Sequence, residues 1–300
     1  MLTGRILRGV GGLYWVDGPD GSILQASARG LFRKHHEVPT AGDLVDCEPS
    51  GDPDRPWSIR HIHPRRNFLV RPAVANLDGL VITLSVADPP PDLMLVDKLL
   101  AISYIHGIEP LLILTKTDLS ADATDLLKPY QSVGCLILET APQDETGVTA
   151  FKQWLAGKTA CLAGQSGVGK STLMNRLHGE TVMSVGSISE RIGRGRHTTR
   201  EVVFFPTAGG YLADTPGFST LELPDVGISG NQLADGYPEI VQVRDQCHFN
   251  DCRHIGEPGC AVPDSAIDPE RLERYRQLRS QLDALDTYQK KARPKGLLRN

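Results

Sequence analysis

One eight-residue segment constrains the fold of this chain more than any other. It follows the pattern G-x-x-x-x-G-K-S and consists of Gly164, Gln165, Ser166, Gly167, Val168, Gly169, Lys170 and Ser171. An apolar run at residues 160–163 precedes it, and a stretch with helical character begins at Thr172. A strand, a glycine-rich loop and a helix in this order predict a phosphate-binding loop, where backbone N–H groups and a helix N-terminus face the phosphates.

The residue types within this loop indicate what each one does. The glycines allow the backbone to approach the phosphates closely. Lys170 is expected to reach the β- and γ-phosphates, and the Ser171 hydroxyl is expected to bind Mg²⁺. Because ATP and GTP carry the same phosphates, the base must be selected by other residues.

A short motif at residues 115–118 supplies candidates for base selection. Thr115, Lys116 and Asp118 follow an apolar strand that ends at Leu114, and they resemble the guanine-reading signature Asn-Lys-x-Asp, with threonine in place of the more common asparagine. A carboxylate only accepts hydrogen bonds, so Asp118 would pair with the two adjacent N–H donors on the edge of guanine. The stem of Lys116 would lie along the base.

A second segment supports this interpretation. Thr140 and Ala141 stand at the end of the next expected strand, where a backbone N–H group could meet the guanine carbonyl. Together the two segments predict binding of GTP and GDP rather than ATP.

A third motif, Asp-x-x-Gly, places Asp214 and Gly217 after another expected strand. Asp214 would hold Mg²⁺ through water, and the Gly217 N–H group would meet the γ-phosphate. In ordinary GTPases the phosphate loop comes first along the chain. Here both base-reading segments precede it, so the sequence predicts a circularly permuted GTPase.

Residues 191–200 have the composition of a switch segment. They contain glycines, arginines, His197, Thr198 and Thr199, and we expect Thr199 to close on Mg²⁺ when the γ-phosphate is present. Phe218 stands where many GTPases have a glutamine that orients the attacking water. An apolar ring cannot hold water, so slow intrinsic hydrolysis is predicted.

The order of the patterns predicts three domains. Residues 1–68 contain short β-type runs and turn signals, and they fit a small barrel like the oligonucleotide-binding fold. Residues 69–222 alternate apolar runs with helix-length stretches, as an α/β GTPase domain does. Residues 223–300 are expected to form a mainly helical zinc-binding domain with an amphipathic helix near residues 268–288. The expected strands of the central domain are residues 79–86, 110–114, 135–138 and 159–163, followed by a hairpin of residues 201–205 and 211–213.

A cluster of metal-binding residue types occurs in the third domain. Cys247, Cys252, His254 and Cys260 supply three thiolates and an imidazole, which is the donor set of a closed structural zinc site. His248 is a competing candidate for the imidazole, and buried cysteines beside an unrelated histidine are the alternative. Four protein ligands leave no open position, so the metal would stabilise the fold rather than catalyse.

Composition bears on the partners and the location of the chain. The net charge is −4 and the pI about 6.1, so composition gives no argument for nucleic-acid binding. Basic clusters at residues 29–36 and 60–66 could face either solvent or RNA. The apolar runs are too short to span a membrane, and the first residues lack the pattern of an export signal. We therefore expect a cytoplasmic protein that does not enter membranes.

The barrel, the permuted motifs GQSGVGKS and DTPG, and the segment CRHIGEPGCAV together resemble the bacterial family of ribosome small-subunit-dependent GTPases known as RsgA or YjeQ. The resemblance implies an oligonucleotide-binding barrel, binding to the small (30S) ribosomal subunit and its rRNA late in maturation, and GTP hydrolysis that the subunit stimulates. It also implies that His197 is the best candidate for the catalytic group, with contact to RNA alone as the alternative. A monomer is expected.

Two other function classes are compatible with parts of the sequence. Thr115 and Phe218 would also suit an RNA-binding scaffold whose nucleotide site has little turnover. The phosphate loop alone would suit an ATP-using kinase or ATPase, although Asp118 argues against this. Nucleotide competition and turnover measurements separate the three classes.

Overall fold

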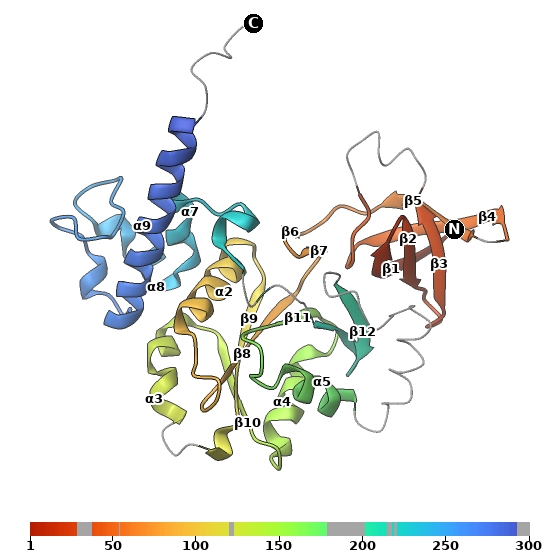
Figure 1. Ribbon diagram of the computed structural model, residues 1–300, viewed down its shortest axis with the longest axis horizontal. Coiled ribbons are helices and arrows are strands. Elements are labelled where there is room, and N and C mark those ends of the chain that lie inside the picture. Colours follow the sequence, from red (N-terminus) through yellow and green to blue (C-terminus); the bar gives the residue numbers. More distant parts are fainter. Residues whose placement is uncertain are drawn as a thin grey trace, which may run out of the picture.

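The computed structural model describes residues 1–28, 38–53, 55–119, 123–178, 202–214, 218 and 221–292. Figure 1 shows a barrel, a central sheet with helices on both faces, and a group of helices packed beside the sheet. The three types of architecture are those that the sequence predicts. The domain limits at residues 68 and 222 remain predictions.

The N-terminal part is a closed five-stranded barrel with the strand order β1-β2-β3-β5-β4. Its strands are β1 (Leu2–Val10), β2 (Leu13–Asp17), β3 (Ile23–Ala28), β4 (Leu44–Asp52) and β5 (Arg55–Ile62). Strands β3 and β5 pair in parallel and the other pairs are antiparallel. A separate core of mostly β-branched and small side chains fills the barrel: Ile6, Tyr14, Val16, Ala26, Val45, Cys47, Ile59 and Ile62.

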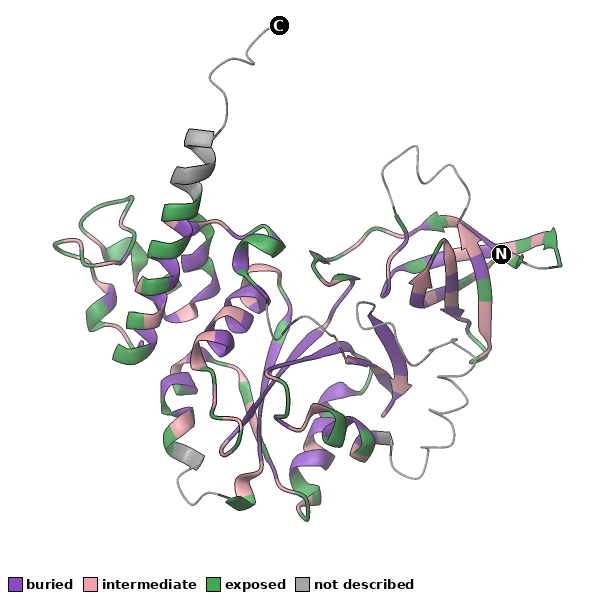
Figure 2. Ribbon diagram, in the orientation of Figure 1, coloured by how far each residue is buried: buried purple, intermediate pink, exposed green. Residues whose placement is uncertain are grey.

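The central sheet has six strands in the order β10-β9-β8-β11-β13-β12. Five are parallel, and β12 pairs antiparallel with β13. Every residue of β8 and β11 is buried, as Figure 2 shows, because helices cover both faces of the sheet. The strands are β8 (Gly79–Ser85), β9 (Glu109–Thr115), β10 (Leu136–Thr140), β11 (Thr159–Ala163), β12 (Val203–Thr207) and β13 (Gly210–Asp214).

Helices on the two faces connect these strands. On one face lie α2 (Leu93–Ile105) and the short α3 (Ala123–Leu127); on the other lie α4 (Glu145–Leu155) and α5 (Lys170–His178). Helix α2 packs on β8 and β9, and α4 packs on β10 and β13. The sheet therefore separates the face that carries α4 and α5 from the face that carries α2 and α3.

The hairpin before Asp214 differs in detail from its prediction. The expected break at residues 206–210 is too wide, since Pro206 pairs with Tyr211 and belongs to β12. The turn consists of Ala208 and Gly209 alone, both with positive φ, which suits the twist of a two-residue hairpin. The short hairpin β6 (Phe68–Val70) and β7 (Ala73–Ala75) lies between the barrel and the sheet.

The barrel contacts the β12–β13 hairpin of the central sheet. The Tyr211 hydroxyl donates a hydrogen bond of 2.8 Å to the Asp17 carboxylate, and the Arg5 guanidinium lies 5.3 Å from the centre of the Tyr211 ring. Leu7 on β1 belongs to the main core rather than to the barrel core. The barrel is thus packed onto the sheet through β1.

The C-terminal part is mainly helical. It contains the short helices α7 (Gly230–Leu233) and α8 (Pro238–Val241) and the long helix α9 (Pro269–Ala292). The apolar stripe of the predicted amphipathic helix is buried at Leu272, Tyr275, Leu278 and Leu282 of α9, whereas Leu285, at the next position of the stripe, is 46% exposed.

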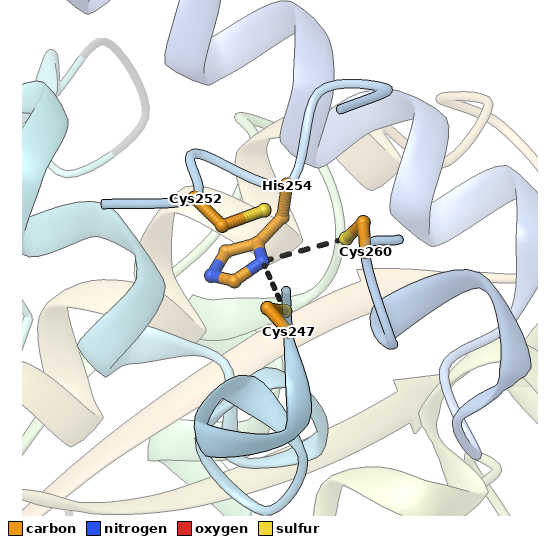
Figure 3. Close-up of side chains that lie close together, drawn as sticks. All are labelled: Cys247, Cys252, His254 and Cys260. Atoms are coloured by element: carbon orange, nitrogen blue, oxygen red, sulfur yellow. Dashed lines mark hydrogen bonds between the residues drawn. The ribbon is translucent and has the colours of Figure 1, made fainter. Parts of the chain in front are cut away.

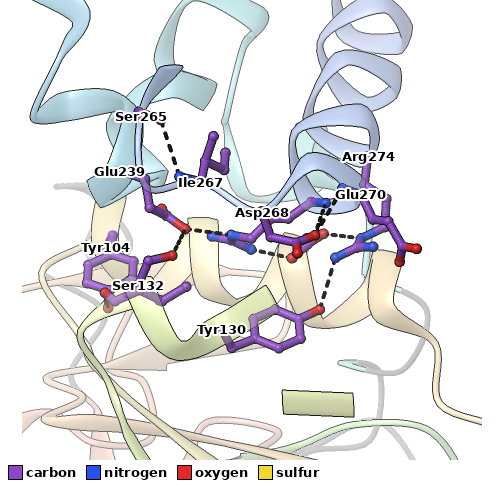
Figure 4. Close-up of polar contacts among 12 residues, drawn as sticks. Tyr104, Tyr130, Ser132, Glu239, Ser265, Ile267, Asp268, Glu270 and Arg274 are labelled. Carbon is purple, nitrogen blue, oxygen red and sulfur yellow. Dashed lines mark hydrogen bonds and ion pairs between the residues drawn. The ribbon is translucent and has the colours of Figure 1, made fainter. Parts of the chain in front are cut away.

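A buried ion-pair network fastens α9 to α2. Arg271 on α9 is fully buried, and its guanidinium contacts the carboxylates of Asp97 on α2 and Glu239 on α8, the latter at 2.9 Å. Arg274 also pairs with Asp97 and reaches the Tyr130 hydroxyl, as Figure 4 shows. Burial raises the pKa of Asp97, and the two guanidinium groups act against this effect. Two cations and two anions balance one another, which allows them to be buried together.

Candidate functional site

The predicted nucleotide-binding segments meet at one edge of the central sheet. Strands β9, β10, β11 and β13 are parallel, and each motif stands at the carboxyl end of its strand. Because the strand order is β10-β9-β8-β11-β13, the edge presents the two base-reading segments first, then the phosphate loop, and then Asp214. Ligands of open α/β sheets bind at this edge.

The phosphate loop joins β11 to α5, which begins at Lys170. Gly164 has a φ of 132°, and a Cβ atom there would lie 2.1 Å from the Thr83 carbonyl oxygen, so only glycine fits. The Lys170 ammonium group donates to the carbonyls of Gly164 and Gln165, at 2.8 and 2.5 Å. The loop therefore curls around the lysine, as a phosphate-binding loop requires.

Thr115 connects the base-reading segment to the phosphate loop. Its hydroxyl donates to the Val168 carbonyl at 2.6 Å, and the side chain is buried. Lys116, with a φ of 59°, donates to the carbonyls of Gly167, at 3.1 Å, and of Asp88. Thr115 and Lys116 thus tie the base-reading segment to the phosphate loop.

The remaining base-reading residues lie at or just after the carboxyl ends of β9 and β10. Asp118 is exposed in a short 3₁₀ helix, where its carboxylate is free to meet a base. Thr140 is buried, and its hydroxyl donates to the Leu114 carbonyl at 3.3 Å. Ala141 follows it directly, at the start of the loop that leads to α4.

Arg176 is a residue of this site that sequence reasoning missed. From α5 it donates to the carbonyls of Ala141 and Asp144, both at 2.6 Å, and it pairs with Glu145 at 2.8 Å. It therefore holds the second base-reading loop against the helix of the phosphate loop. No motif marks Arg176, because two of its partners are backbone carbonyls more than 30 residues away in the sequence.

Gln165 makes a second contact that the motif did not predict. Its side-chain oxygen accepts a hydrogen bond of 3.0 Å from the backbone N–H group of Asp92, the residue that caps the N-terminus of α2. Helix α2 also carries Asp97, which belongs to the buried ion-pair network with α9. The phosphate loop is thereby linked through one helix to the C-terminal helices.

Asp214 ends β13, where its neighbour on β11 is Leu162. Its carboxylate is close enough to raise the pKa of Lys170, although burial of the ammonium group has the larger, opposite effect and lowers that pKa. Ser171 is exposed in the first turn of α5. Lys170, Ser171 and Asp214 thus gather at the end of the site where the phosphates and Mg²⁺ are predicted to bind.

Several predicted site residues cannot be placed. His197, Thr199 and Gly217 lie outside the described residues, as does the rest of the expected switch segment. Phe218 is described and fully buried, in the main hydrophobic core. At that position the chain therefore offers the attacking water no polar side chain.

The four predicted metal ligands come together in the C-terminal part (Figure 3). The donor atoms of Cys247, Cys252, His254 and Cys260 all lie within 4.8 Å of one another. The His254 Nδ1 atom is 3.6 Å from both the Cys247 and the Cys260 sulfur. Tetrahedral zinc with ordinary bond lengths would hold sulfur and nitrogen roughly 3.6 Å apart, so the cluster fits zinc.

The surrounding loop holds these ligands in place. His254 is buried and has a φ of 62°, and the Glu257 carboxylate accepts from the backbone N–H groups of Ile255 and Arg253 at 2.9 and 3.2 Å. Burial acts against ionisation of Glu257, but these N–H groups outweigh it and lower its pKa to about 2. His248, the competing candidate, is exposed and packs edge-to-face on Phe249.

A comparison with protein families decides the assignment. A family model described as "RsgA GTPase" matches residues 62–224, more than half of the chain, and one described as "RsgA N-terminal domain" matches residues 3–54. The chain belongs to the RsgA GTPase family. The barrel and the sheet with its phosphate loop are thus the parts that this family shares, and membership implies GTP, GDP and Mg²⁺ as ligands.

Relatives of this RsgA-family chain match it over nearly its full length. A protein of Ruminiclostridium cellulolyticum, named "Small ribosomal subunit biogenesis GTPase RsgA", is 40% identical, and the match covers 97% of each chain. A protein of the same name from Bacillus velezensis is 36% identical, and the match covers 94% of this chain and 98% of that protein.

Two solved structures share the fold. YjeQ from Thermotoga maritima superposes with a TM-score of 0.77 at 28% identity, covering 94% of this chain and 98% of its own. YloQ, described as a circularly permuted GTPase, superposes with a TM-score of 0.75 at 29% identity, covering 95% of this chain and 96% of its own.

Among the described residues of the RsgA-family chain, no helix is both long and apolar enough to cross a membrane.

Proposed function

We propose that this chain is a GTPase that acts in the biogenesis of the small ribosomal subunit. The observation that supports this most directly is a contact between the base-reading segment and the phosphate loop. Thr115 donates a hydrogen bond to the Val168 carbonyl, and Lys116 donates one to the Gly167 carbonyl. A nucleotide bound there would be read at its base and its phosphates by one connected unit. The names of relatives at 36–40% identity support the biological role.

Base selection rests on Asp118, whose carboxylate would accept from the two N–H groups of guanine. The Lys116 side chain covers the base, and Thr140 and Ala141 present the backbone N–H group for its carbonyl. Arg176 positions this last segment through its bonds to the Ala141 and Asp144 carbonyls. Adenine, which has a different donor pattern, would leave Asp118 without a partner.

Phosphate binding rests on the segment from Gly164 to Thr172, with Lys170 on the β- and γ-phosphates. Ser171, Thr199 and Asp214 would hold Mg²⁺, which when bound neutralises charge on the phosphate oxygens. The Gly217 N–H group would detect the γ-phosphate. Loss of that phosphate would release the switch segment.

Hydrolysis needs a group to orient the attacking water, and the buried ring of Phe218 cannot provide one. We assign this role to His197 in the switch segment, acting when the chain is bound to the ribosomal subunit. In a His197→Ala variant, GTP should still bind, while subunit-stimulated turnover should fall toward the rate without subunits. Stimulation at the level of the unchanged protein would exclude this role.

One structural Zn²⁺ would be held by Cys247, Cys252, His254 and Cys260, with no open coordination position. The metal would tie the loop between α8 and α9 and so fix α9 against α2. The contacts to RNA phosphates are proposed to lie on the arginine-rich switch segment and the basic loops of the barrel, and the chain is proposed to work as a monomer.

The proposed cycle can be tested by sedimentation with purified small subunits. The chain should sediment with them in the presence of a non-hydrolysable GTP analogue, and less so with GDP. Equal binding in both states would contradict nucleotide control. The alternative of an RNA-binding scaffold predicts that equal binding, together with no turnover.

A further inference from the structure

A second group of metal-ligating side chains lies on the outside of the barrel, far from the thiolate cluster in the sequence. It consists of Asp46 on β4, His61 on β5 and His63 just beyond β5. One nitrogen from each imidazole and one carboxylate oxygen lie within 4.8 Å of one another. Neither the GTPase motifs nor the zinc cluster uses these residues.

The two histidines are two residues apart and therefore lie on the same surface of the strand, and a β-bulge turns that surface outward. Asp46 pairs with His61 and Cys47 pairs with Ile59, so Arg60 is an extra residue in β5. Ile59 and Ile62, three residues apart, both face the barrel core because of this bulge. His61 and His63 flank Ile62 and are left outside, with side chains 59% and 39% exposed.

The backbone holds all three residues in defined positions. Asp46 lies between Val45 and Cys47, which both point into the barrel core, so its own side chain points outward. The backbone N–H group of His63 donates to the Leu44 carbonyl at 2.9 Å, which extends the β4–β5 ladder past the end of β5. The cluster therefore rests on paired strands and not on a free loop.

The distances between donor atoms are close to those around one ion. The His63 Nε2 atom is 3.0 Å from one Asp46 carboxylate oxygen, and the His61 Nδ1 atom is 3.6 Å from the other. Ligands about 2.1 Å from a zinc-sized ion lie roughly 3.0 to 3.5 Å apart when they are neighbours in its coordination shell. The exposed ring of His61 has room for the remaining adjustment.

The carboxylate is also oriented as a metal ligand would be. The Thr3 hydroxyl on β1 donates a hydrogen bond of 2.6 Å to the Asp46 carboxylate. Hydrogen bonds to a ligating carboxylate fix its direction in known metal sites. The Asp46 carboxylate is thus held on the side from which the imidazoles approach.

We propose that Asp46, His61 and His63 form a binding site for a divalent transition-metal ion on the barrel. Two imidazoles and one carboxylate favour Zn²⁺, Co²⁺ or Ni²⁺ over Mg²⁺ and Ca²⁺, which prefer oxygen ligands. Three protein ligands leave positions for water, unlike the closed thiolate cluster. A bound ion would cross-link β4 to the end of β5 and so stabilise the barrel.

Co²⁺ is a suitable probe because it reports its ligands by absorption. The full chain, first loaded with one equivalent of Zn²⁺, is titrated with Co²⁺. One equivalent should bind with weak visible bands and without the near-ultraviolet charge-transfer band that thiolate ligands produce. A thiolate band would mean that Co²⁺ has entered the cysteine cluster, and the absence of visible bands would overturn the proposal.

The variants His61→Gln and Asp46→Asn identify the ligands. Each should weaken Co²⁺ binding by about tenfold or more, while Asp52→Asn, which removes an exposed carboxylate from the same strand, should leave it unchanged. His61 is mostly exposed, so its variant tests the site without disturbing the barrel core. Equal affinity in His61→Gln and the unchanged chain would contradict the proposal.

Stability gives a second, independent measurement. An ion that binds only the folded barrel raises its unfolding temperature, and above Kd the rise grows with the logarithm of the free ion concentration. Added Zn²⁺ should raise the unfolding temperature of the zinc-loaded chain, and the rise should be lost in His61→Gln. The same rise in both proteins would place the bound ion elsewhere and overturn the assignment.

Discussion

The hydroxyl of Thr115 and the backbone carbonyl of Val168 form a hydrogen bond of 2.6 Å across 53 positions of sequence. This bond joins the segment that reads the base to the loop that binds the phosphates. Its donor is buried, so loss of the hydroxyl would leave the Val168 carbonyl without this partner. Removal of one partner of a buried hydrogen bond costs about 1–3 kcal/mol.

Thr115→Val keeps the shape of the side chain and removes only the hydroxyl. We expect its affinity for GTP and GDP to fall by roughly 5-fold to 100-fold, because the two binding segments lose a buried hydrogen bond that connects them. Fluorescent-nucleotide titration measures the effect. Thr115→Ser, which retains the hydroxyl, should bind nearly as well as the unchanged chain; an unaltered affinity in Thr115→Val would refute the link.

Asp118→Asn should change the preferred base. The asparagine amide replaces one acceptor with a donor, so the charge-assisted pair with guanine is lost and GTP binding should weaken by about tenfold or more. Xanthine has a carbonyl where guanine has an amino group, so xanthosine triphosphate should bind better than it does to the unchanged chain. Competition between GTP and xanthosine triphosphate measures the change in base preference. Asp118 is exposed, and the fold should not suffer.

The buried ion pairs between α2 and α9 give a prediction about stability. Arg271→Met leaves the Asp97 and Glu239 carboxylates buried with less compensation and should destabilise the chain by about 3–5 kcal/mol. Arg276→Met breaks only a partly exposed pair with Glu273 on the same helix and should cost less than about 1 kcal/mol. Urea unfolding followed by circular dichroism compares the two. Similar losses of unfolding free energy in both variants would show that the buried network stabilises the chain no more than an exposed ion pair does.

Zinc removal should unfold the loop that contains the cysteine cluster. Burial raises the pKa of the Cys252 thiol to about 12, so this thiol is protonated without metal and must release its proton when zinc binds. Zinc affinity should therefore rise with pH. The variant Cys260→Ser should lose one zinc equivalent by elemental analysis, whereas Cys135→Ser, a half-buried cysteine outside the cluster, should keep it. Zinc retained by Cys260→Ser would argue against the ligand set.

The sequence predicted those parts of the fold in which residue type and local order are decisive. The strand at residues 159–163 was located to the residue, since an apolar run meets a glycine that no other residue can replace. The cysteine spacing likewise led to the observed cluster. The sequence predicts a turn at residues 206–210, wider than the observed turn at Ala208 and Gly209. The reason is that proline usually interrupts a strand, whereas the edge strand β12 tolerates it.

Tertiary contacts set the limit of that reasoning. The partners of Arg176 and Gln165 are backbone groups brought close only by folding, and backbone groups leave no trace in a sequence pattern. Arg271 was part of an amphipathic helix and gave no sign of being fully buried. The two barrel histidines share one surface by strand alternation, but this surface faces outward because of a bulge that residue spacing alone does not reveal.

The rate of GTP hydrolysis with and without purified small ribosomal subunits tests whether the subunit controls turnover by this chain. We expect slow turnover by the chain alone, because Phe218 is buried where a water-orienting side chain would stand. Added subunits should stimulate turnover at least about tenfold, a lower bound well below the roughly 10³-fold to 10⁵-fold that a catalytic arginine supplied by a partner gives other GTPases. An equal rate in the presence and absence of subunits would contradict control of hydrolysis by the subunit.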